Sequence, residues 1–417
     1  MAEKINVPEI RFAGFIDPWE QRKLGNCGTA YGGLTGKTKE DFGHGNARFI
    51  PYTNVFDNPL ADTKRLEAVE IDSSQNQVAY GDAFFTVSSE TPDEVGMSSV
   101  WLSDQEDVYL NSFCFGYRQD STFDPHYLAY MLRSRSVRSN LTLLAQGISR
   151  FNISKNKVME LSVPVPSAVE QKQLGQYFTK LDSLITLHQR KFEKLVQLKK
   201  SMLDKMFPKP GERFPEIRFA GFTDPWEQRK LGELTTILSA VRVHKEEWRT
   251  AGVPFYRSSD VMAAFKGTEN ERVFISQELF EQLSAQSGAP QKGDVMVTGG
   301  GSVGTPYIVP DNKPLYTKDA DLIWIKRHTE INPKFLYSFF ISPIFKSYIR
   351  SISHVGTIAH YTIEQVKETP LLMPCSIVEQ KAIGSFLGNL DSLITLHQRK
   401  LELLRNTKKS LLDRMFV

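Results

Sequence analysis

The string LDSLITLHQRK occurs twice in this chain, at residues 181–191 and again at residues 390–400. Identity of this length does not arise by chance, so the sequence is a tandem duplication. A repeat of this kind constrains the fold more than any local pattern, because each copy must form the same structural unit. The 417 residues therefore predict two repeats, each large enough to bury a core of its own.

A second string opens each repeat. EIRFAGFIDPWEQRKLG at residues 9–25 returns at residues 216–232 with a single change, Ile16 against Thr223. Each half of the chain thus begins with one shared cassette and ends with another. The linker FPKPGERF joins the first half to the second, and the chain stops where this linker would begin again. Closing the chain there would give a ring of two similar halves, so we expect the termini to lie close together.

The stretches between the cassettes, 26–160 and 233–368, share almost no sequence. Both contain short apolar and aromatic runs broken by Gly, Asn, Asp and Pro, which indicates a mixed α/β fold of the α+β kind. Each then reaches a helix-like stretch whose expected N-caps are Asp124 and Asn332, with a proline at the first helical position. The sequence predicts two domains of one fold that carry different surfaces.

Each half ends in a proline-containing connector and a long helix whose apolar positions recur in steps of three and four residues. That spacing is typical of the seam of a coiled coil. Because each stripe is narrow, we expect the helices to pack on each other, antiparallel, as a rigid spacer about 57 Å long. His188 and His397 fall on the seam, where a polar layer that sets the register is favoured over a metal site. The seam residues are Leu181, Ile185, His188, Phe192, Leu195, Leu198, Met202 and Met206, and then Leu390, Ile394, His397, Leu401, Leu404, Thr407, Leu411 and Met415.

These patterns predict a pseudo-two-fold tandem repeat in which two globular domains are separated by the antiparallel helices. The predicted segments are an N-terminal arm, a first domain, a connector with the first helix, a linker with the repeated cassette, a second domain, and a connector with the second helix. Their boundaries are 1–17, 18–160, 161–210, 211–224, 225–369 and 370–417.

Composition excludes several classes of protein. An apolar content of 41% and a charged content of 24% are those of a globular protein, and we expect neither a signal segment nor a membrane span. Three scattered cysteines argue against a disulfide framework or a structural zinc site and suit the cytoplasm. A net charge of +3 is nearly neutral for this length, so any surface that binds nucleic acid must be local.

No motif for catalysis stands out. GKT at residues 36–38 resembles part of a phosphate-binding loop, but the first glycine of that motif is missing. The GxGxxG pattern at residues 299–304 is followed by a strand and a turn, not by a helix that would offer its N-terminus to a phosphate, so a hairpin or a bulge is predicted. The histidines show no metal-ligand spacing. We expect no catalytic residue and no metal in this chain.

The near-identical cassettes around dissimilar domains carry a functional argument. Whatever the cassettes contact is the same in both halves, and whatever the domains contact differs. The simplest interpretation is one protein partner bound twice and one target recognised in two unlike parts. Double-stranded DNA is a natural target of this kind, because it is a regular lattice that can be contacted at two places a fixed distance apart.

Over essentially its whole length the chain resembles the specificity subunit of type I DNA restriction-modification enzymes. The resemblance is carried by the PWEQRKLG cassettes, the glycine-rich stretch GDVMVTGGGSVG, the connectors that end in EQK, and the duplicated LDSLITLHQRK helices. The first domain departs from the pattern, because GDAFFTVSSETPDEVG keeps Gly81 and Asp82 but lacks the glycine-rich loop.

The resemblance implies recognition without catalysis. Each domain would be a target recognition domain for one half of an asymmetric, interrupted DNA sequence, and the helices and cassettes would bind two methyltransferase subunits, which the restriction motor-nuclease subunit joins. S-adenosylmethionine, ATP and Mg²⁺ would be bound by those partners and not by this chain. Two alternatives stay open: a coiled-coil scaffold that does not recognise sequence, and a self-contained methyltransferase or nuclease with duplicated recognition modules.

Polar residues in loops of the two domains are the candidates for DNA contact, because such side chains bond base edges and phosphates. Those around Ser149 and Thr357 are favoured, since a glycine precedes each of them shortly before the turn into the shared connector. The candidates are Lys37, Lys39, Tyr52, Asn54, Ser149 and Arg150 in the first domain, and Arg242, Lys245, Arg257, Ser302, Thr357 and His360 in the second.

Overall fold

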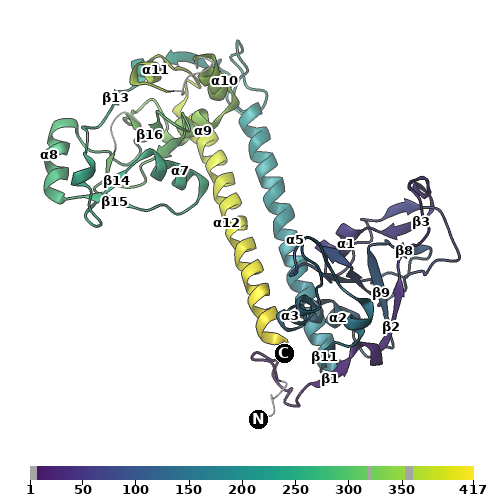
Figure 1. Ribbon diagram of the computed structural model, residues 1–417. Coiled ribbons are helices and arrows are strands. Elements are labelled where there is room, and N and C mark those ends of the chain that lie inside the picture. Colours follow the sequence, from purple (N-terminus) through teal and green to yellow (C-terminus); the bar gives the residue numbers. More distant parts are fainter. Residues whose placement is uncertain (1–6, 318–321, 353–359) are drawn as a thin grey trace. The chain divides into compact units, whose positions relative to one another are not determined.

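The computed structural model describes residues 7–317, 322–352 and 360–417, and the chain forms two compact units. The first unit is Met1–His188 with Lys400–Val417, and the second unit is Gln189–Arg399. Each unit contains one variable segment and part of each long helix, α5 (Ala168–Lys205) and α12 (Ile377–Met415), drawn in teal and yellow in Figure 1. None of the helices in the described part of the chain combines the length and apolar character that a membrane span needs.

The variable part of the first unit is built on two sheets. One has the strand order β2-β9-β5-β7 with antiparallel neighbours, and the other has the order β4-β3-β8, in which β3 and β8 are parallel. The remaining elements of this unit are β1 (Glu20–Lys23), β2 (Gly28–Gly32), β3 (Phe42–Ile50), α1 (Tyr52–Asp57), β4 (Glu67–Val69), β5 (Ala83–Thr86), β6 (Ser88–Ser89), β7 (Ser98–Val100), β8 (Val108–Leu110), β9 (Cys114–Gln119), α2 (Pro125–Met131), α3 (Arg135–Leu143), β10 (Phe151–Asn152), α4 (Lys155–Met159) and β11 (Ser162–Val165), with 3-10 turns at Leu24–Asn26 and Lys39–Asp41.

The second unit repeats this topology with different residues. Its sheets have the orders β13-β19-β16-β17 and β15-β14-β18, and β14 and β18 form its parallel pair. The prediction of two domains of one fold is therefore confirmed. The elements are β12 (Glu227–Lys230), α6 (Leu231–Leu234), β13 (Ile237–Leu238), β14 (Val253–Tyr256), α7 (Ser258–Lys266), β15 (Val273–Ile275), α8 (Gln277–Ser287), β16 (Val295–Thr298), β17 (Pro306–Ile308), β18 (Tyr316–Thr317), β19 (Leu322–Ile325), α9 (Pro333–Ile341), α10 (Pro343–Ile352), α11 (Ile363–Glu368) and β20 (Pro370–Met373), with a 3-10 turn at Lys245–Glu247.

The opening cassette pairs with the connector inside each unit. β1 and β11 are antiparallel, with Glu20 opposite Val165, and β12 and β20 repeat the pair with Glu227 opposite Met373. The EQRK strand of the opening cassette thus lies against the proline-containing strand of the connector. The repeat in the sequence is a repeat of this contact.

A buried carboxylate fastens the opening cassette to the start of the long helix. Glu170, in the first turn of α5, is 1% exposed. It accepts hydrogen bonds from Arg11 Nε at 2.6 Å, Arg11 Nη2 at 2.8 Å and Trp19 Nε1 at 3.1 Å. A bidentate pair between arginine and carboxylate is among the stronger hydrogen-bonded interactions in proteins. The residues that make the same bonds in the second unit are Glu379, Arg218 and Trp226.

The next residue of each connector fixes the start of a domain helix. Gln171 Oε1 accepts from Asp124 N at 2.8 Å, and Gln171 Nε2 donates to Thr122 O and Pro166 O. Asp124 is the N-cap of α2, as predicted, and its side chain accepts from Tyr127 N. The Glu-Gln pair therefore ties the long helix both to the cassette and to the variable domain. In the second unit the corresponding residues are Gln380, Asn332, Glu330 and Pro374.

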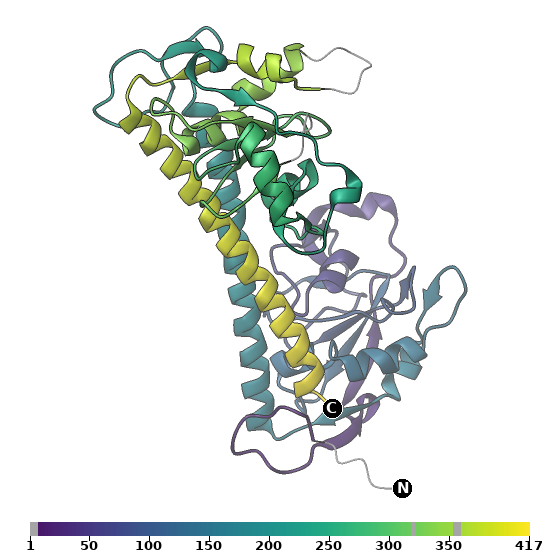
Figure 2. The same cartoon turned by 90° about the vertical axis from the view of Figure 1, so that its left-hand side faces the viewer.

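Within each unit the segments of α5 and α12 run side by side in opposite directions, which Figure 2 shows from a second direction. In the first unit Lys408 Nζ binds Asp182 Oδ1 at 2.5 Å, and Phe178, one turn earlier on α5, packs against Phe416. In the second unit the equivalent pair joins Lys199 Nζ to Asp391 Oδ1 at 2.5 Å. The predicted antiparallel pairing is confirmed inside each unit.

One predicted seam position is wrong. Leu198 is 41% exposed, whereas Leu195 and Met202 on either side of it are partly buried. Lys199, four residues after Leu195, occupies the seam position that was predicted for Leu198, because its ammonium group binds Asp391 on the other helix. A lysine can hold a seam position in this way when its stem packs and its charge is paired.

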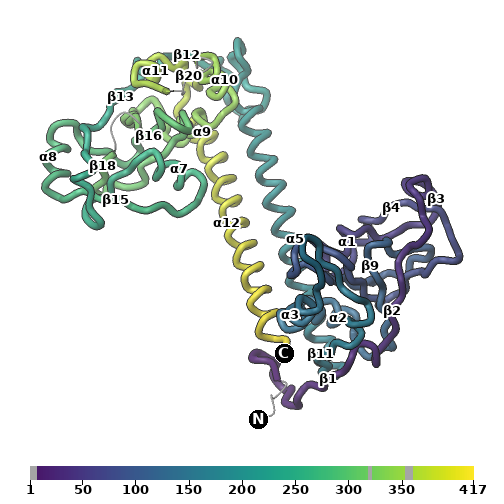
Figure 3. The backbone as a smooth tube through the Cα atoms, in the orientation of Figure 1, coloured from purple at the N-terminus to yellow at the C-terminus, as the bar shows by residue number. Residues whose placement is uncertain are grey.

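Residues near the two ends of the chain meet in the first unit, which confirms the predicted closeness of the termini (Figure 3). Ile10 N donates to Arg414 O at 2.9 Å, Arg414 Nη2 binds Glu9 Oε1 at 2.6 Å, and Phe416 packs against Trp19. The second unit makes the same contacts through a covalent linker, with Ile217, Lys205, Glu216, Phe207 and Trp226 as the corresponding residues.

Replacement of Glu170 by alanine is expected to lower the free energy of unfolding of the first unit by about 3 kcal/mol, because Arg11 would stay largely buried without its partner. Urea denaturation followed by tryptophan fluorescence measures this change. Glu20→Ala is the control, since Glu20 pairs with Arg22 at the surface and its loss should leave the unfolding midpoint unchanged. Equal effects of the two substitutions would contradict the role given to Glu170.

Candidate nucleic-acid interface

In both variable domains the loop that leaves a central strand meets the chain just before the last short helix. After β5, Val87 O accepts from Ile153 N at 2.9 Å, and after β16, Gly299 O accepts from Tyr361 N at 2.7 Å. In each domain these bonds bring together two loop regions that are about 60 residues apart in the sequence. The turn into the connector, where DNA contact is predicted, therefore lies beside a second loop in each domain.

Two of the predicted residues converge in the first domain. Tyr52 Oη donates to Ser88 O at 2.8 Å, and Arg150 Nη2 donates to Ser88 Oγ at 3.3 Å. Burial raises the pKa of the Tyr52 phenol. Ser149, next to Arg150, is exposed. The cluster offers hydroxyl and guanidinium groups at the surface, which are the groups that bond phosphates and base edges.

The two predicted lysines of the first domain lie in different surroundings. Lys37 Nζ is bound to Asp72 Oδ2 at 2.9 Å, and the hydrogen bond to Asp72 raises the pKa of Lys37. Its ammonium group is therefore engaged within the domain. Lys39 begins a 3-10 turn and is exposed, so it can face a phosphate.

Asn54 is a correction to the predicted set. It is fully buried, its amide donates to Asp62 O and Arg65 O at 2.9 Å each, and its carbonyl oxygen accepts from Asp62 N. Because every polar atom of the side chain is used to hold the loop after α1, Asn54 supports the fold and has no surface through which it could contact DNA.

Arg257, another predicted residue, makes contacts within its own domain. It precedes α7, where Arg257 Nε binds Asp260 Oδ2 at 2.9 Å and Nη2 donates to Glu271 O at 2.5 Å. Its guanidinium also lies over the ring of Trp248, 5.6 Å from the centroid. These three contacts hold α7 and the chain that leads to β15 in place, so Arg257 serves the scaffold of the second domain.

The remaining predicted residues of the second domain are at the surface where the structure describes them. Ser302 sits in the hairpin between β16 and β17, which confirms the hairpin predicted for the GxGxxG pattern. Gly304 has φ +79°, and a Cβ there would lie 2.5 Å from the ring of Phe345, so only glycine fits. Arg242, Lys245 and His360 are exposed or partly exposed, and Thr357 lies outside the described residues.

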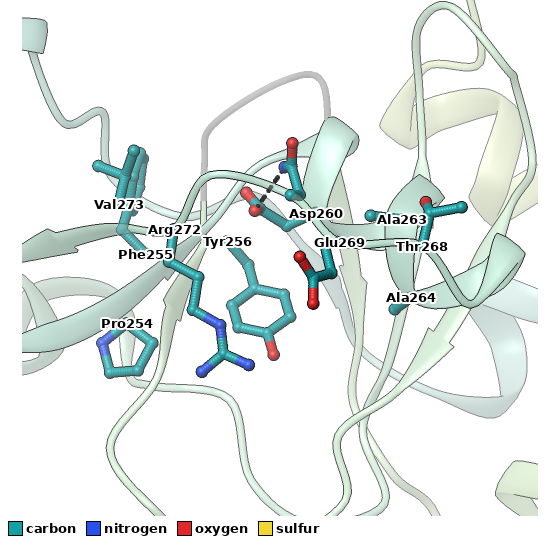
Figure 4. A pocket seen from close by; sticks show the side chains of 11 residues that line it. Pro254, Phe255, Tyr256, Asp260, Ala263, Ala264, Thr268, Glu269, Arg272 and Val273 are labelled. Atoms are coloured by element: carbon teal, nitrogen blue, oxygen red, sulfur yellow. Dashed lines mark hydrogen bonds between the residues drawn. The ribbon is translucent and has the colours of Figure 1, made fainter. Parts of the chain in front are cut away.

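A pocket of about 450 Å³ opens between β14, α7 and the chain that leads to β15 (Figure 4). Arg272 and Glu269 lie on either side of the Tyr256 ring in this view. Neither charged side chain forms a hydrogen bond or an ion pair with any residue in the described ranges. Tyr307 Oη donates to Tyr256 Oη at 3.3 Å. The other lining residues are Pro254, Phe255, Asp260, Ala263, Ala264, Thr268, Asn270 and Val273.

Arg272 and Glu269 were not among the predicted residues, although a signal was present. They are the first and last residues of the polar run ENER at residues 269–272, which lies between α7 and β15. A free guanidinium matches the acceptors of guanine, and a free carboxylate accepts from the amino group of cytosine. These two side chains are therefore stronger candidates for base contact than Arg257, because they form no hydrogen bond or ion pair with the residues that the structure describes.

The family described as type I restriction modification DNA specificity domain matches the chain twice, over residues 16–197 and 223–406. The putative type I restriction enzyme MjaX specificity subunit of Methanocaldococcus jannaschii is 22% identical over 423 residues, covering 98% of this chain and 95% of that protein. The MjaVIII specificity subunit of the same organism is 24% identical over 315 residues, covering 71% of this chain and 70% of that protein.

A solved structure has a similar fold. It is the S subunit of the type I restriction-modification system of M. genitalium, with a TM-score of 0.56 and 15% identity over 99% of each chain. At this level of identity the similarity concerns the fold alone. It agrees with the two domains and two long helices described above.

Arg257→Ala is expected to lower the free energy of unfolding of the second unit by about 2 kcal/mol, because the largely buried carboxylate of Asp260 loses its ion pair. Arg272→Ala should change it by less than about 0.5 kcal/mol, as is usual for an exposed side chain without partners. Urea denaturation of the two variants compares the values. A destabilised Arg272 variant would show that Arg272 belongs to the scaffold instead.

Proposed function

The chain belongs to the family of type I restriction-modification DNA specificity subunits and carries two recognition domains, and we propose that it directs the enzyme to a DNA sequence of two unlike parts. The first recognition domain, residues 18–160, contacts one part and the second, residues 225–369, contacts the other. Each contact uses side chains that bond base edges, while lysines and arginines bond phosphates. The chain itself performs no catalysis in this proposal.

One observation carries the proposal. The framework contacts of Glu170 and Gln171 recur residue for residue at Glu379 and Gln380, while the exposed loops of the two domains differ in length and in charge. Selection has thus kept one framework twice and placed two different surfaces on it. A bipartite, asymmetric target accounts for that division.

The helices offer a surface for the partner that is shared by both halves. Leu184 and Leu187 are exposed on α5, and the repeat places Leu393 and Leu396, also exposed, at the same positions of α12. The fold does not need these leucines, since they point away from the core, yet both copies retain them. We assign them to the docking of two methyltransferase subunits, one on each pair.

The chemistry of the complex then lies on its partners. The methyltransferase subunits bind S-adenosylmethionine, and each takes its target adenine out of the DNA stack, as enzymes that act on a base do. ATP and Mg²⁺ belong to the motor-nuclease subunit that joins this core. The role of this chain is to bind DNA and to hold the partners in register.

A domain exchange tests the proposed function. Residues 26–160 are replaced by the matching segment of a relative, and the sites methylated by the complex are mapped by sequencing. The exchange leaves β1 and β11 intact, so the framework pairing survives. One part of the methylated sequence is expected to change while the other part stays the same. A change in both parts, or in neither, would contradict the assignment of one domain to each part.

Arg272→Ala is expected to relax recognition only in the part assigned to the second domain, at a cost of about 2 kcal/mol, which is the discrimination that one bidentate base contact provides. Competition binding with single-base variants of the mapped site measures this change. Lys266→Ala, at an exposed residue of the same domain, is the control and should weaken binding to all sequences equally or not at all. Unaltered discrimination by the Arg272 variant would remove this residue from the interface.

Replacement of Leu184 and Leu187 together by asparagine is expected to reduce the number of bound methyltransferase subunits from two to one. Native mass spectrometry of the purified complex counts them. The matched control is Leu403→Lys, an exposed leucine on α12 whose counterpart on α5 is Lys194. Retention of two subunits by the double variant would show that the partner docks elsewhere.

A further inference from the structure

One apolar residue of the first recognition domain lies entirely in solvent. Ile148 is 96% exposed, more than any other large apolar side chain in the described part of the chain. Isoleucine side chains in folded proteins are most often buried, because each one removed from water contributes about 1.5–3 kcal/mol. An isoleucine held fully outside the core forgoes this stabilisation, so packing within the domain does not account for its position.

The loop that presents Ile148 is closed by hydrogen bonds at its base. Gln146 N donates to Asn152 O at 2.9 Å, and Asn152 N donates to Gln146 O at 2.8 Å. β10, which contains Asn152, is in turn paired with β6. At the tip, a Cβ on Gly147 would lie 2.0 Å from Arg150 O, so this tight turn needs glycine. The loop therefore holds Ile148 out in a fixed conformation and not on a flexible tail.

Polar and cationic residues follow this apolar tip in the chain. Ser149 and Arg150 follow directly, and α4 adds the exposed lysines Lys155 and Lys157 a few residues later. A docking surface for another protein usually needs a contiguous apolar patch of a few hundred Å². A single apolar side chain followed by cations is better suited to a polyanion with an apolar interior than to a protein surface. Stacked base pairs between two phosphate backbones have that character.

We propose that Ile148 inserts as an apolar wedge between adjacent base pairs in the part of the site bound by the first recognition domain. This inference rests on the proposed function. Apolar side chains that enter a base step unstack it and kink the duplex, and the cations beside them hold the backbone. Arg150, Lys155 and Lys157 hold the phosphates on either side of the opened step.

The test uses the complex of the full chain with its methyltransferase partner and duplexes that carry the mapped site. 2-Aminopurine replaces each adenine in turn, except the adenines that become methylated, and its fluorescence reports unstacking. The wild-type complex is expected to raise the fluorescence at one step of the first part. Ile148→Ser should abolish this rise and weaken binding about tenfold, the effect of losing one buried aliphatic contact. The second part should be unaffected.

Two further variants distinguish insertion of an apolar side chain from a general disturbance of the loop or the fold. Ile148→Leu should keep both the rise and the affinity, because a leucine can enter the same step. Ile16→Thr is the matched control, since Ile16 is 86% exposed in the shared cassette and Thr223 is the natural residue at the equivalent position. It should bind DNA as the wild type does. The unfolding midpoint of every variant should equal that of the wild type.

Three outcomes would overturn the inference. Ile148→Ser could bind as tightly as the wild type with the rise intact. Alternatively, its loss of affinity could be reproduced by replacing thymines with uracils while no base unstacks, which would place Ile148 against a thymine methyl group in the major groove. Finally, a wild-type complex that prefers no sequence would refute the proposed function itself, whereas the first two outcomes leave it standing.

Discussion

The buried carboxylates of Glu170 and Glu379 are the interactions on which the rest of the structure depends. A charge removed from water destabilises a protein by several kcal/mol unless it is fully paired and hydrogen-bonded. Each of these carboxylates is paired only when an arginine and a tryptophan of the opening cassette reach the first turn of a long helix. Cassette, connector and helix are therefore one cooperative element, and a change in any of them is felt by all. This coupling explains why the two copies stayed nearly identical while the domains between them diverged.

The features that could be predicted from the sequence are those that depend on short-range patterns. Asp124 and Asn332 were identifiable as caps because a proline follows each of them, and capping needs only the next few residues. The long helices followed from their apolar spacing and the repeat. Leu198 shows the limit of this reasoning, since periodicity alone does not reveal that a lysine can occupy a seam when an aspartate stands opposite.

The candidate site was less predictable, because the role of a polar side chain depends on partners far away in the sequence. Asn54 and Arg257 have the right chemistry for DNA, yet the loop after α1 uses every polar atom of the Asn54 side chain, and Arg257 binds Asp260 and the backbone of Glu271 within its domain. Arg272, by contrast, is exposed and forms no hydrogen bond or ion pair with the residues that the structure describes. Ile148 was overlooked for the opposite reason, since an apolar residue is assumed to be buried until the structure shows otherwise.

The closing contacts of the first unit have a consequence for the order of folding. Phe416 and Arg414 complete a domain whose strands begin before residue 30, so the last contacts of this domain can form only after the whole second unit has been synthesised. The second unit lies within the continuous stretch 189–399 and has all of its parts earlier. Nascent proteins usually fold from the N-terminus onward. In this chain the first unit is synthesised first but can complete its folding only after residues 414–416 have been added. The second unit is synthesised later and can complete its folding earlier.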